Sequence, residues 1–200
     1  MKVRRFAITI LLLLVASSCT QSTVVVKPPK IDPGKAASGA IKQYDGNGDG
    51  KLDEDELAVS ALGLAMWDVD KDGGVAEAEI TQRLEEFIDS KVGLMTTTCY
   101  VSWNGEPLDG AKVDFESEAF LGDGVQPSTG VTNESGMAKI CVAKELLPHP
   151  NVTGIQPGLY KVRITHPEVT LPAKYNSDTT LTYESSPIDT LPQPSFDLSK

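Results

Sequence analysis

Two twelve-residue stretches, D-G-N-G-D-G-K-L-D-E-D-E at Asp45–Glu56 and D-V-D-K-D-G-G-V-A-E-A-E at Asp68–Glu79, follow one pattern. Each has an oxygen-bearing side chain at positions 1, 3 and 5, glycine at position 6, an aliphatic residue at position 8 and glutamate at position 12. This spacing suits a hard divalent cation with six to eight oxygen ligands, because side chains alternate towards the ion and a bidentate carboxylate closes the shell. The sequence therefore predicts two calcium-binding loops.

The positions within each loop assign the predicted ligands. In the first loop these are the side chains of Asp45, Asn47, Asp49 and Glu56, the backbone carbonyl of Lys51, and Asp53 directly or through water. In the second loop they are the side chains of Asp68, Asp70, Asp72 and Glu79, the backbone carbonyl of Gly74, and a water at the place of Ala76. Each loop gathers four carboxylates, whose mutual repulsion is relieved by a divalent ion.

The charge of the chain is concentrated around these loops. The whole chain of 200 residues carries −10, and residues 41–91 alone hold 14 acidic and 5 basic residues, a balance of −9. A localised acidic block favours a cation as partner and excludes nucleic acid, since phosphate contacts need a basic face. A hydrophobic content of 40% excludes disorder throughout.

The N-terminus has the pattern of a targeting segment. Lys2, Arg4 and Arg5 precede an apolar run over Phe6–Val15 that is too short to span a bilayer comfortably, and small residues then lead to Cys19. The stretch resembles a bacterial lipoprotein signal covering residues 1–18, which implies that a lipidated Cys19 anchors the mature chain to a membrane. By the same resemblance, Thr20 after the cysteine favours the outer membrane. A plain secretory signal is the alternative. Residues 19–35 are predicted to form an extended tether.

Helical periodicity is restricted to residues 36–93, the predicted calcium-binding domain. Apolar residues at helical spacing predict helices before the first loop, over Leu57–Trp67 between the loops, and after the second loop from Ile80 to Ile88. An unbroken helix over Leu57–Trp67 would separate the two ions, whereas a kink at Gly63 would let the loops meet through Leu52 and Val75. The sequence leaves both arrangements open.

Residues 96–200 change to short alternating runs separated by turn signals, a pattern typical of an antiparallel β-sandwich. The predicted strands are Tyr100–Trp103, Ala111–Phe115, Met137–Val142, Gly158–Thr165, Thr179–Tyr183 and Ser195–Leu198. The fold class is therefore α + β in separate domains, with a small helical module followed by the sandwich.

Both halves resemble known families. The two loops resemble EF-hand calcium loops, and their close spacing is similar to that of dockerin modules. V-S-W-N-G-E-P-L-D-G-A-K-V-D-F (Val101–Phe115), T-N-E-S-G (Thr132–Gly136) and G-I-Q-P-G-L-Y-K-V-R-I (Gly154–Ile164) resemble the carboxypeptidase regulatory-like, or transthyretin-like, domain. P-A-K-Y-N (Pro172–Asn176) and F-D-L (Phe196–Leu198) resemble the endings of small bacterial surface lipoproteins with this domain. These motifs specify a fold and leave the activity open.

No catalytic pattern accompanies these motifs. The chain has no nucleophile-elbow pattern and no P-loop, and its two histidines, His149 and His166, lack convergent partners. We therefore expect a calcium-binding, lipid-anchored cell-envelope protein with a structural, non-enzymatic role. The alternative is a calcium-dependent module that binds an envelope protein or glycan. An exported chain meets an oxidising compartment, which permits a disulfide between Cys99 and Cys141. Their positions relative to neighbouring apolar residues favour opposite strand faces, so a bridge and two free thiols both stay open.

Overall fold

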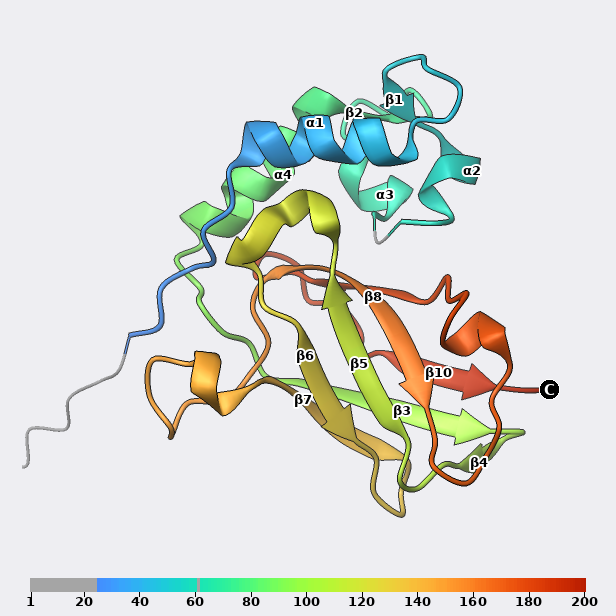
Figure 1. Cartoon of the computed structure of the whole chain (residues 1–200). Helices are drawn as coiled ribbons and strands as arrows, with labels where there is room; N and C mark the ends of the chain where they lie inside the picture. Colours follow the sequence, from blue (N-terminus) through green and yellow to red (C-terminus); the bar gives the residue numbers. More distant parts are fainter. Residues whose placement is uncertain (1–24, 61) are drawn as a thin grey trace, which may run out of the picture.

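The structure is a computed structural model that describes residues 25–60 and 62–200 (Figure 1). The predicted signal segment, Cys19 and the first residues of the predicted tether lie outside the described residues. Among the helices that are described, none combines the length and the apolar character needed to cross a bilayer.

The chain runs through a helical part and then a sheet. The helices are α1 (Pro33–Tyr44), α2 (Glu54–Leu57), α3 (Leu64–Trp67) and α4 (Glu77–Asp89), with 3-10 helices η1 (Ala119–Gly124), η2 (Lys144–Leu146) and η3 (Ala173–Tyr175). The strands are β1 (Lys51–Leu52), β2 (Val75–Ala76), β3 (Thr97–Trp103), β4 (Glu106–Pro107), β5 (Lys112–Ser117), β6 (Ser128–Val131), β7 (Met137–Val142), β8 (Gly158–Thr165), β9 (Thr182–Ser185) and β10 (Ser195–Leu198).

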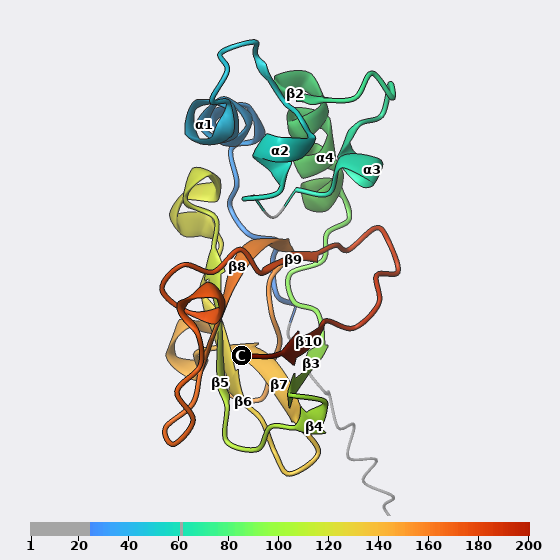
Figure 2. The same cartoon turned by 90° about the vertical axis from the view of Figure 1, so that its right-hand side faces the viewer.

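The second half of the chain is β-rich, as predicted, and its strands form one curled, mainly antiparallel sheet. The strand order is β10-β3-β7-β6-β5-β8-β9, with β4 paired to β3. Strand β7 pairs with β3 through residues 137–140 and with β6 through residues 141–142, so the sheet turns along this strand (Figures 1 and 2). Strand β10 runs parallel to β3, which departs from the all-antiparallel prediction. The connection between Ser185 and Ser195 crosses from β9, at one edge of the curled sheet, to β10, at the other edge.

One face of the sheet is buried along β5 and β8. Strand β5, and β8 from Tyr160 onward, alternate buried and more exposed residues, and Val113, Phe115, Val162 and Ile164 are all buried. The Phe115 ring packs edge-on against Tyr183, with 5.4 Å between the ring centroids. Alternation with a period of two places these side chains on a common face. All four side chains belong to the continuous hydrophobic cluster of the molecule.

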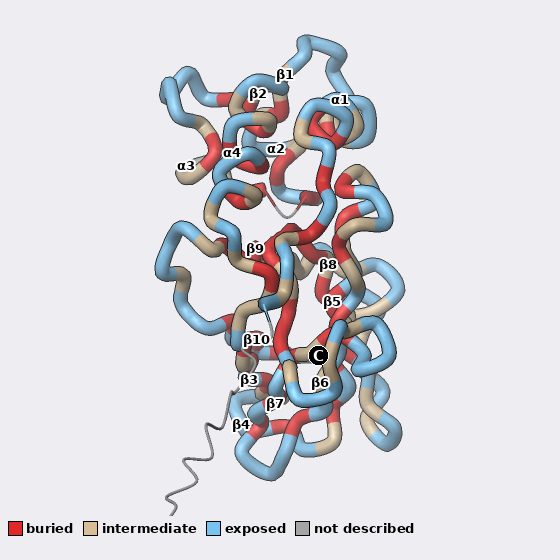
Figure 3. The backbone as a smooth tube through the Cα atoms, turned by 90° about the vertical axis from the view of Figure 1, so that its left-hand side faces the viewer, coloured by how far each residue is buried: buried red, intermediate tan, exposed pale blue. Residues whose placement is uncertain are grey.

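The helical part, residues 33–89, packs directly on one end of the sheet (Figures 1 and 2). Helix α1 contacts both α4 and η1, and the buried side chains of helices and strands form one continuous hydrophobic cluster. Buried stretches of the chain accordingly extend across the boundary between the two parts (Figure 3). The two predicted domains are therefore in close contact, with one shared core.

The predicted tether is partly integrated into the fold. Helix α1 begins at Pro33, inside the predicted tether, because Pro suits the first helical turn and the Asp32 carboxylate accepts a hydrogen bond from the Lys35 N–H at 3.2 Å. The preceding residues lie against two glycines of the fold. A Cβ added at Gly93 would stand 2.2 Å from the Val26 carbonyl oxygen, and one at Gly124 would stand 1.9 Å from that of Lys30. The described tether residues are thus held on the protein surface.

The unbroken helix over Leu57–Trp67, one of the two arrangements that the sequence left open, is not formed. The structure has the short helices α2 and α3 there, separated by a turn. The Ser60 hydroxyl accepts a hydrogen bond from the Leu62 N–H at 3.2 Å, which competes with helical bonding. The new helix starts after Gly63, whose carbonyl accepts from Met66 and Trp67. The break folds the chain back so that the two loops can lie side by side.

Candidate metal centre

The two predicted loops meet in a small antiparallel ladder. Strand β1 of the first loop pairs with β2 of the second, with Lys51 opposite Ala76 and Leu52 opposite Val75. Leu52 and Val75 are both fully buried. The two loops therefore meet and are not held apart, and position 8 of one loop packs beside position 8 of the other.

The closing glutamates organise both loops in the same way. In the second loop, Glu79 Oε1 accepts hydrogen bonds from the Val69 N–H at 2.7 Å and the Asp70 N–H at 3.3 Å, and its Oε2 accepts from the Ala76 N–H at 2.8 Å. In the first loop, Glu56 accepts from the corresponding amides, those of Gly46, Asn47 and Asp53, at 2.7, 3.2 and 3.0 Å. The carboxylate at position 12 thus holds the beginning and the later part of its own loop together through these hydrogen bonds.

The first aspartate and the glycine at position 6 are also equivalent in the two loops. Asp45 Oδ2 accepts from the Gly50 N–H at 2.9 Å, and Asp68 Oδ2 accepts from the Gly73 N–H at 3.0 Å. Both glycines have positive φ, 87° and 95°. An L-residue with a side chain is disfavoured there, which explains why both loops carry glycine at this position.

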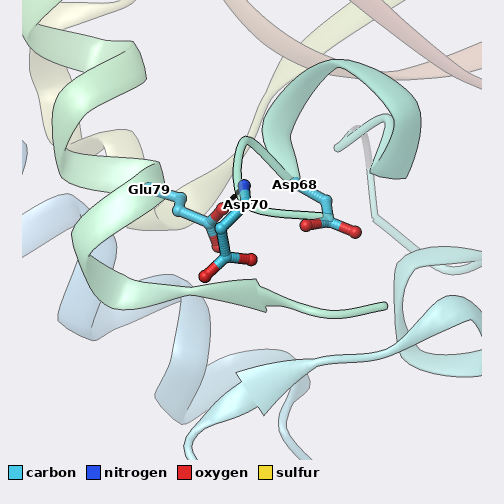
Figure 4. A group of neighbouring side chains, drawn as sticks. All are labelled: Asp68, Asp70 and Glu79. Carbon is cyan, nitrogen blue, oxygen red and sulfur yellow. Dashed lines mark hydrogen bonds between the residues drawn. The ribbon is translucent and has the colours of Figure 1, made fainter. Parts of the chain in front are cut away.

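Three carboxylates of the second loop converge. One oxygen from each of Asp68, Asp70 and Glu79 lies within 4.8 Å of the others, and the side chains come from the end of α3, from the loop and from the start of α4 (Figure 4). Asp70 is exposed, while Asp68 and Glu79 are half-buried. This donor set fits a hard cation such as Ca²⁺, which takes carboxylate oxygens and completes its shell with carbonyls and water.

The remaining predicted ligands are placed differently. The Asp72 carboxylate is paired with the ammonium of Lys51 from the first loop, and this hydrogen bond lowers the pKa of Asp72. Asp53 Oδ1 caps α2 by accepting from the amides of Asp55 and Glu56. Within residues 25–60 and 62–200, the carboxylates of the first loop form no group as tight as that of Asp68, Asp70 and Glu79. The carbonyls of Lys51 and Gly74 stay predicted ligands.

An aromatic residue directly before each loop joins that loop to the sheet side of the molecule. The Tyr44 hydroxyl donates to Glu118 Oε2 at 2.6 Å, and Trp67 Nε1 donates to Glu184 Oε2 at 2.9 Å. Glu118 is 2% exposed and Glu184 is 8% exposed. Burial, together with the bond to Glu118, raises the pKa of Tyr44. We call these two contacts the junction bonds, since they connect the helical part to the sheet.

Arg83 reinforces the second junction bond. Its guanidinium pairs with Glu184 at 2.9 Å and with Asp189, and its Cζ lies 5.7 Å from the centroid of the Trp67 ring. Burial raises the pKa of Glu184, while the hydrogen bonds from Trp67 and Arg83 oppose this effect. Sequence reasoning missed Arg83, Glu184 and Asp189. The one available signal was an arginine on the otherwise apolar face of a helix, one turn after Glu79.

Cys99 and Cys141 are free thiols, so the disulfide that the sequence left open is not formed. Cys99 is fully buried in β3, opposite Ala138 of β7, whereas Cys141 of β7 is half-exposed. Ala138 and Cys141 are three residues apart on β7 and therefore point to opposite faces of the sheet. Burial raises the pKa of the Cys99 thiol to about 11.

Comparison of the chain with models of protein families finds no match, and comparison with curated proteins finds none either.

Proposed function

We propose that the chain binds calcium at its two loops and that the bound ions stabilise the seating of the helical part on the sheet. In this proposal the protein is a calcium-binding, lipid-anchored component of the cell envelope with a structural, non-enzymatic role. The observation that carries it is the repeated hydrogen-bonding scheme of the loops, in which position 12 gathers the amides of positions 2, 3 and 9 twice over.

Electrostatics supports an ion at these loops. The second loop holds Asp68, Asp70 and Glu79 with oxygens within 4.8 Å, where like charges repel unless a cation lies among them. Calcium is favoured over magnesium because it accepts a flexible shell of six to eight oxygens, whereas magnesium demands near-octahedral geometry and keeps its waters. The first loop has the same scheme of amide bonds, and we assign it a second calcium ion.

The order of elements supports the family resemblances. Helix α1, the first loop, the broken pair α2 and α3, the second loop and α4 follow one another, and β1–β2 joins the loops. We propose that this part is an EF-hand pair with a shortened connection. For the curled sheet we propose a carboxypeptidase regulatory-like, or transthyretin-like, domain, on the turn motifs that connect its strands.

The junction bonds support the structural role. Tyr44 precedes Asp45 and Trp67 precedes Asp68, so each residue that donates to the sheet side is covalently attached to the first predicted ligand of a loop. An ion that fixes Asp45 or Asp68 reduces the freedom of the neighbouring aromatic side chain. Calcium would therefore hold the helical part on the sheet more firmly, and an envelope protein would keep one shape under mechanical or chemical stress.

The anchoring is proposed from the lipoprotein-like N-terminus, with the lipid on Cys19 and the outer membrane as the favoured location. Radiolabelled palmitate incorporation into the wild-type chain, compared with Cys19→Ser, tests this part. Label that persists in the Cys19→Ser variant would contradict it.

Calorimetric titration of the full chain in non-ionic detergent with calcium tests the metal sites. We expect two ions for the wild type, and one fewer for each of Glu56→Gln and Glu79→Gln, which remove the closing carboxylates. Glu85→Gln is the matched control: it makes the same charge change on an exposed face of α4, away from the loops. Absence of calcium binding by the wild type, or identical stoichiometry for Glu79→Gln and Glu85→Gln, would refute the assignment.

Limited proteolysis tests the structural role separately. With calcium, we expect slower cleavage both within residues 36–93 and in the segment around Glu184, because the junction bonds connect them. With excess chelator, cleavage at both places should accelerate. If calcium protects only the loops from cleavage, this result would agree with calcium binding but contradict the structural role.

A further inference from the structure

A lysine of the first loop reaches into the second loop. Lys51 is at position 7 of the first loop, where only its backbone carbonyl is a predicted ligand, so its side chain is available for other contacts. Its ammonium pairs with the carboxylate of Asp72, at position 5 of the second loop. Asp72 is a predicted calcium ligand, and it is the predicted side-chain ligand of this loop that does not join Asp68, Asp70 and Glu79.

The path of the Lys51 side chain is shaped by the opposing loop. A Cβ added at Gly74 would stand 3.2 Å from Lys51 Cβ and 3.3 Å from Lys51 Cδ. Because Gly74 has no side chain, the stem of Lys51 has room to lie across the β1–β2 ladder. The Lys51 ammonium can therefore reach the carboxylate of Asp72. The negative charge of Asp70 and Glu79 also acts on the same ammonium. The contact is thus supported by backbone register, by the space at Gly74 and by charge.

We propose that Lys51 competes with calcium for Asp72, and thereby sets the affinity of the second loop and couples it to the first. The proposal rests on the calcium sites of the proposed function. For Asp72 to bind an ion with Asp68, Asp70 and Glu79, its carboxylate must leave Lys51, since both cations attract the same oxygens. A cation supplied by one loop therefore weakens binding at the other.

The test measures calcium binding to the full chain in non-ionic detergent through Trp67 fluorescence, in a Trp103→Phe background that removes the other tryptophan. Lys51→Met keeps an unbranched stem and removes the ammonium. The matched control is Lys71→Met, which removes the same charge from an exposed lysine inside the second loop that makes no ion pair within the described part of the chain. Each substitution removes one positive charge near the second loop and so raises its calcium affinity through long-range electrostatics. Only the difference in calcium affinity between the two variants therefore reports the Lys51–Asp72 contact.

We expect Lys51→Met to bind calcium about two- to five-fold more tightly than Lys71→Met, the range of an exposed ion pair. The difference should shrink between about 0.1 M and about 1 M salt, as the screening length falls from about 10 Å to about 3 Å. Equal affinities of the two variants, or a Lys51→Met affinity equal to the wild type, would overturn the competition while leaving the calcium sites standing. A wild type that binds no calcium, with Glu79→Gln indistinguishable from it, would overturn the proposed function itself.

Discussion

The contact of Arg83 with the sheet offers the sharpest test of the fold. Arg83 and Glu184 are 9% and 8% exposed, and their side chains are joined at 2.9 Å. Replacing Arg83 with Met keeps most of the apolar stem but removes the guanidinium. The Glu184 carboxylate then stays buried with Trp67 Nε1 as its remaining donor among the contacts described above.

The cost follows from this geometry. Removing one member of a buried ion pair destabilises by about 3–5 kcal/mol, because a buried charge loses its partner. The loss of the pair with Asp189 adds little to this destabilisation, since the Asp189 side chain is 42% exposed and water can solvate its carboxylate. For a chain of this size, about 2–4 °C is lost per kcal/mol, so Arg83→Met should lower the melting temperature by about 6–20 °C.

Thermal and guanidinium unfolding, followed by circular dichroism with excess chelator, measure the effect apart from calcium. Lys42→Met on the exposed side of α1 is the control and should change stability by less than about 0.5 kcal/mol. The double variant Arg83→Met/Glu184→Gln should recover more than half of the loss, because it removes the unpaired charge. A loss below about 1 kcal/mol for Arg83→Met, or a double variant no more stable than the single one, would refute the buried pair.

Three further outcomes are expected. Calcium at about 100 times its dissociation constant should stabilise by about 2.7 kcal/mol per site, a rise of about 5–10 °C in melting temperature that excess chelator reverses; an unchanged melting temperature would count against bound calcium. Gly136→Ala should cost at least about 2 kcal/mol more than Gly105→Ala in guanidinium unfolding. Both glycines have positive φ, but an added Cβ at Gly136 stands 2.4 Å from the Val101 carbonyl oxygen and one at Gly105 meets nothing within 4 Å; equal costs would contradict this steric account. Iodoacetamide at about pH 8 should modify Cys141 in the native protein and Cys99 only after denaturant is added, because burial raises the pKa of the Cys99 thiol to about 11 and the thiolate is the reactive form; peptide mass spectrometry would expose early modification of Cys99 as a contradiction.

Short-range order was readable from the amino-acid sequence. The bounds of β7, β8 and β10 agree with the predicted strands Met137–Val142, Gly158–Thr165 and Ser195–Leu198, since alternation and turn residues lie within a few positions of each other. Strand β6 (Ser128–Val131) was missed because it is short and contains Gly130, which has no side chain to signal a buried face. Its backbone approaches β7 closely: an added Cβ at Gly130 would stand 2.6 Å from the Lys139 carbonyl oxygen.

The sequence by itself determined the two loops, because each closing carboxylate reaches amides no more than ten residues away and the spacing alone fixes those partners. Only the tertiary structure decided that the loops lie side by side, that Lys51 meets Asp72, and that Trp67 meets Glu184. Trp67 and Glu184 are 117 residues apart, and Arg83 and Glu184 are 101 residues apart. Contacts at such separations depend on how helices and sheet pack around a shared core, and that packing is a property of the whole chain rather than of any local pattern.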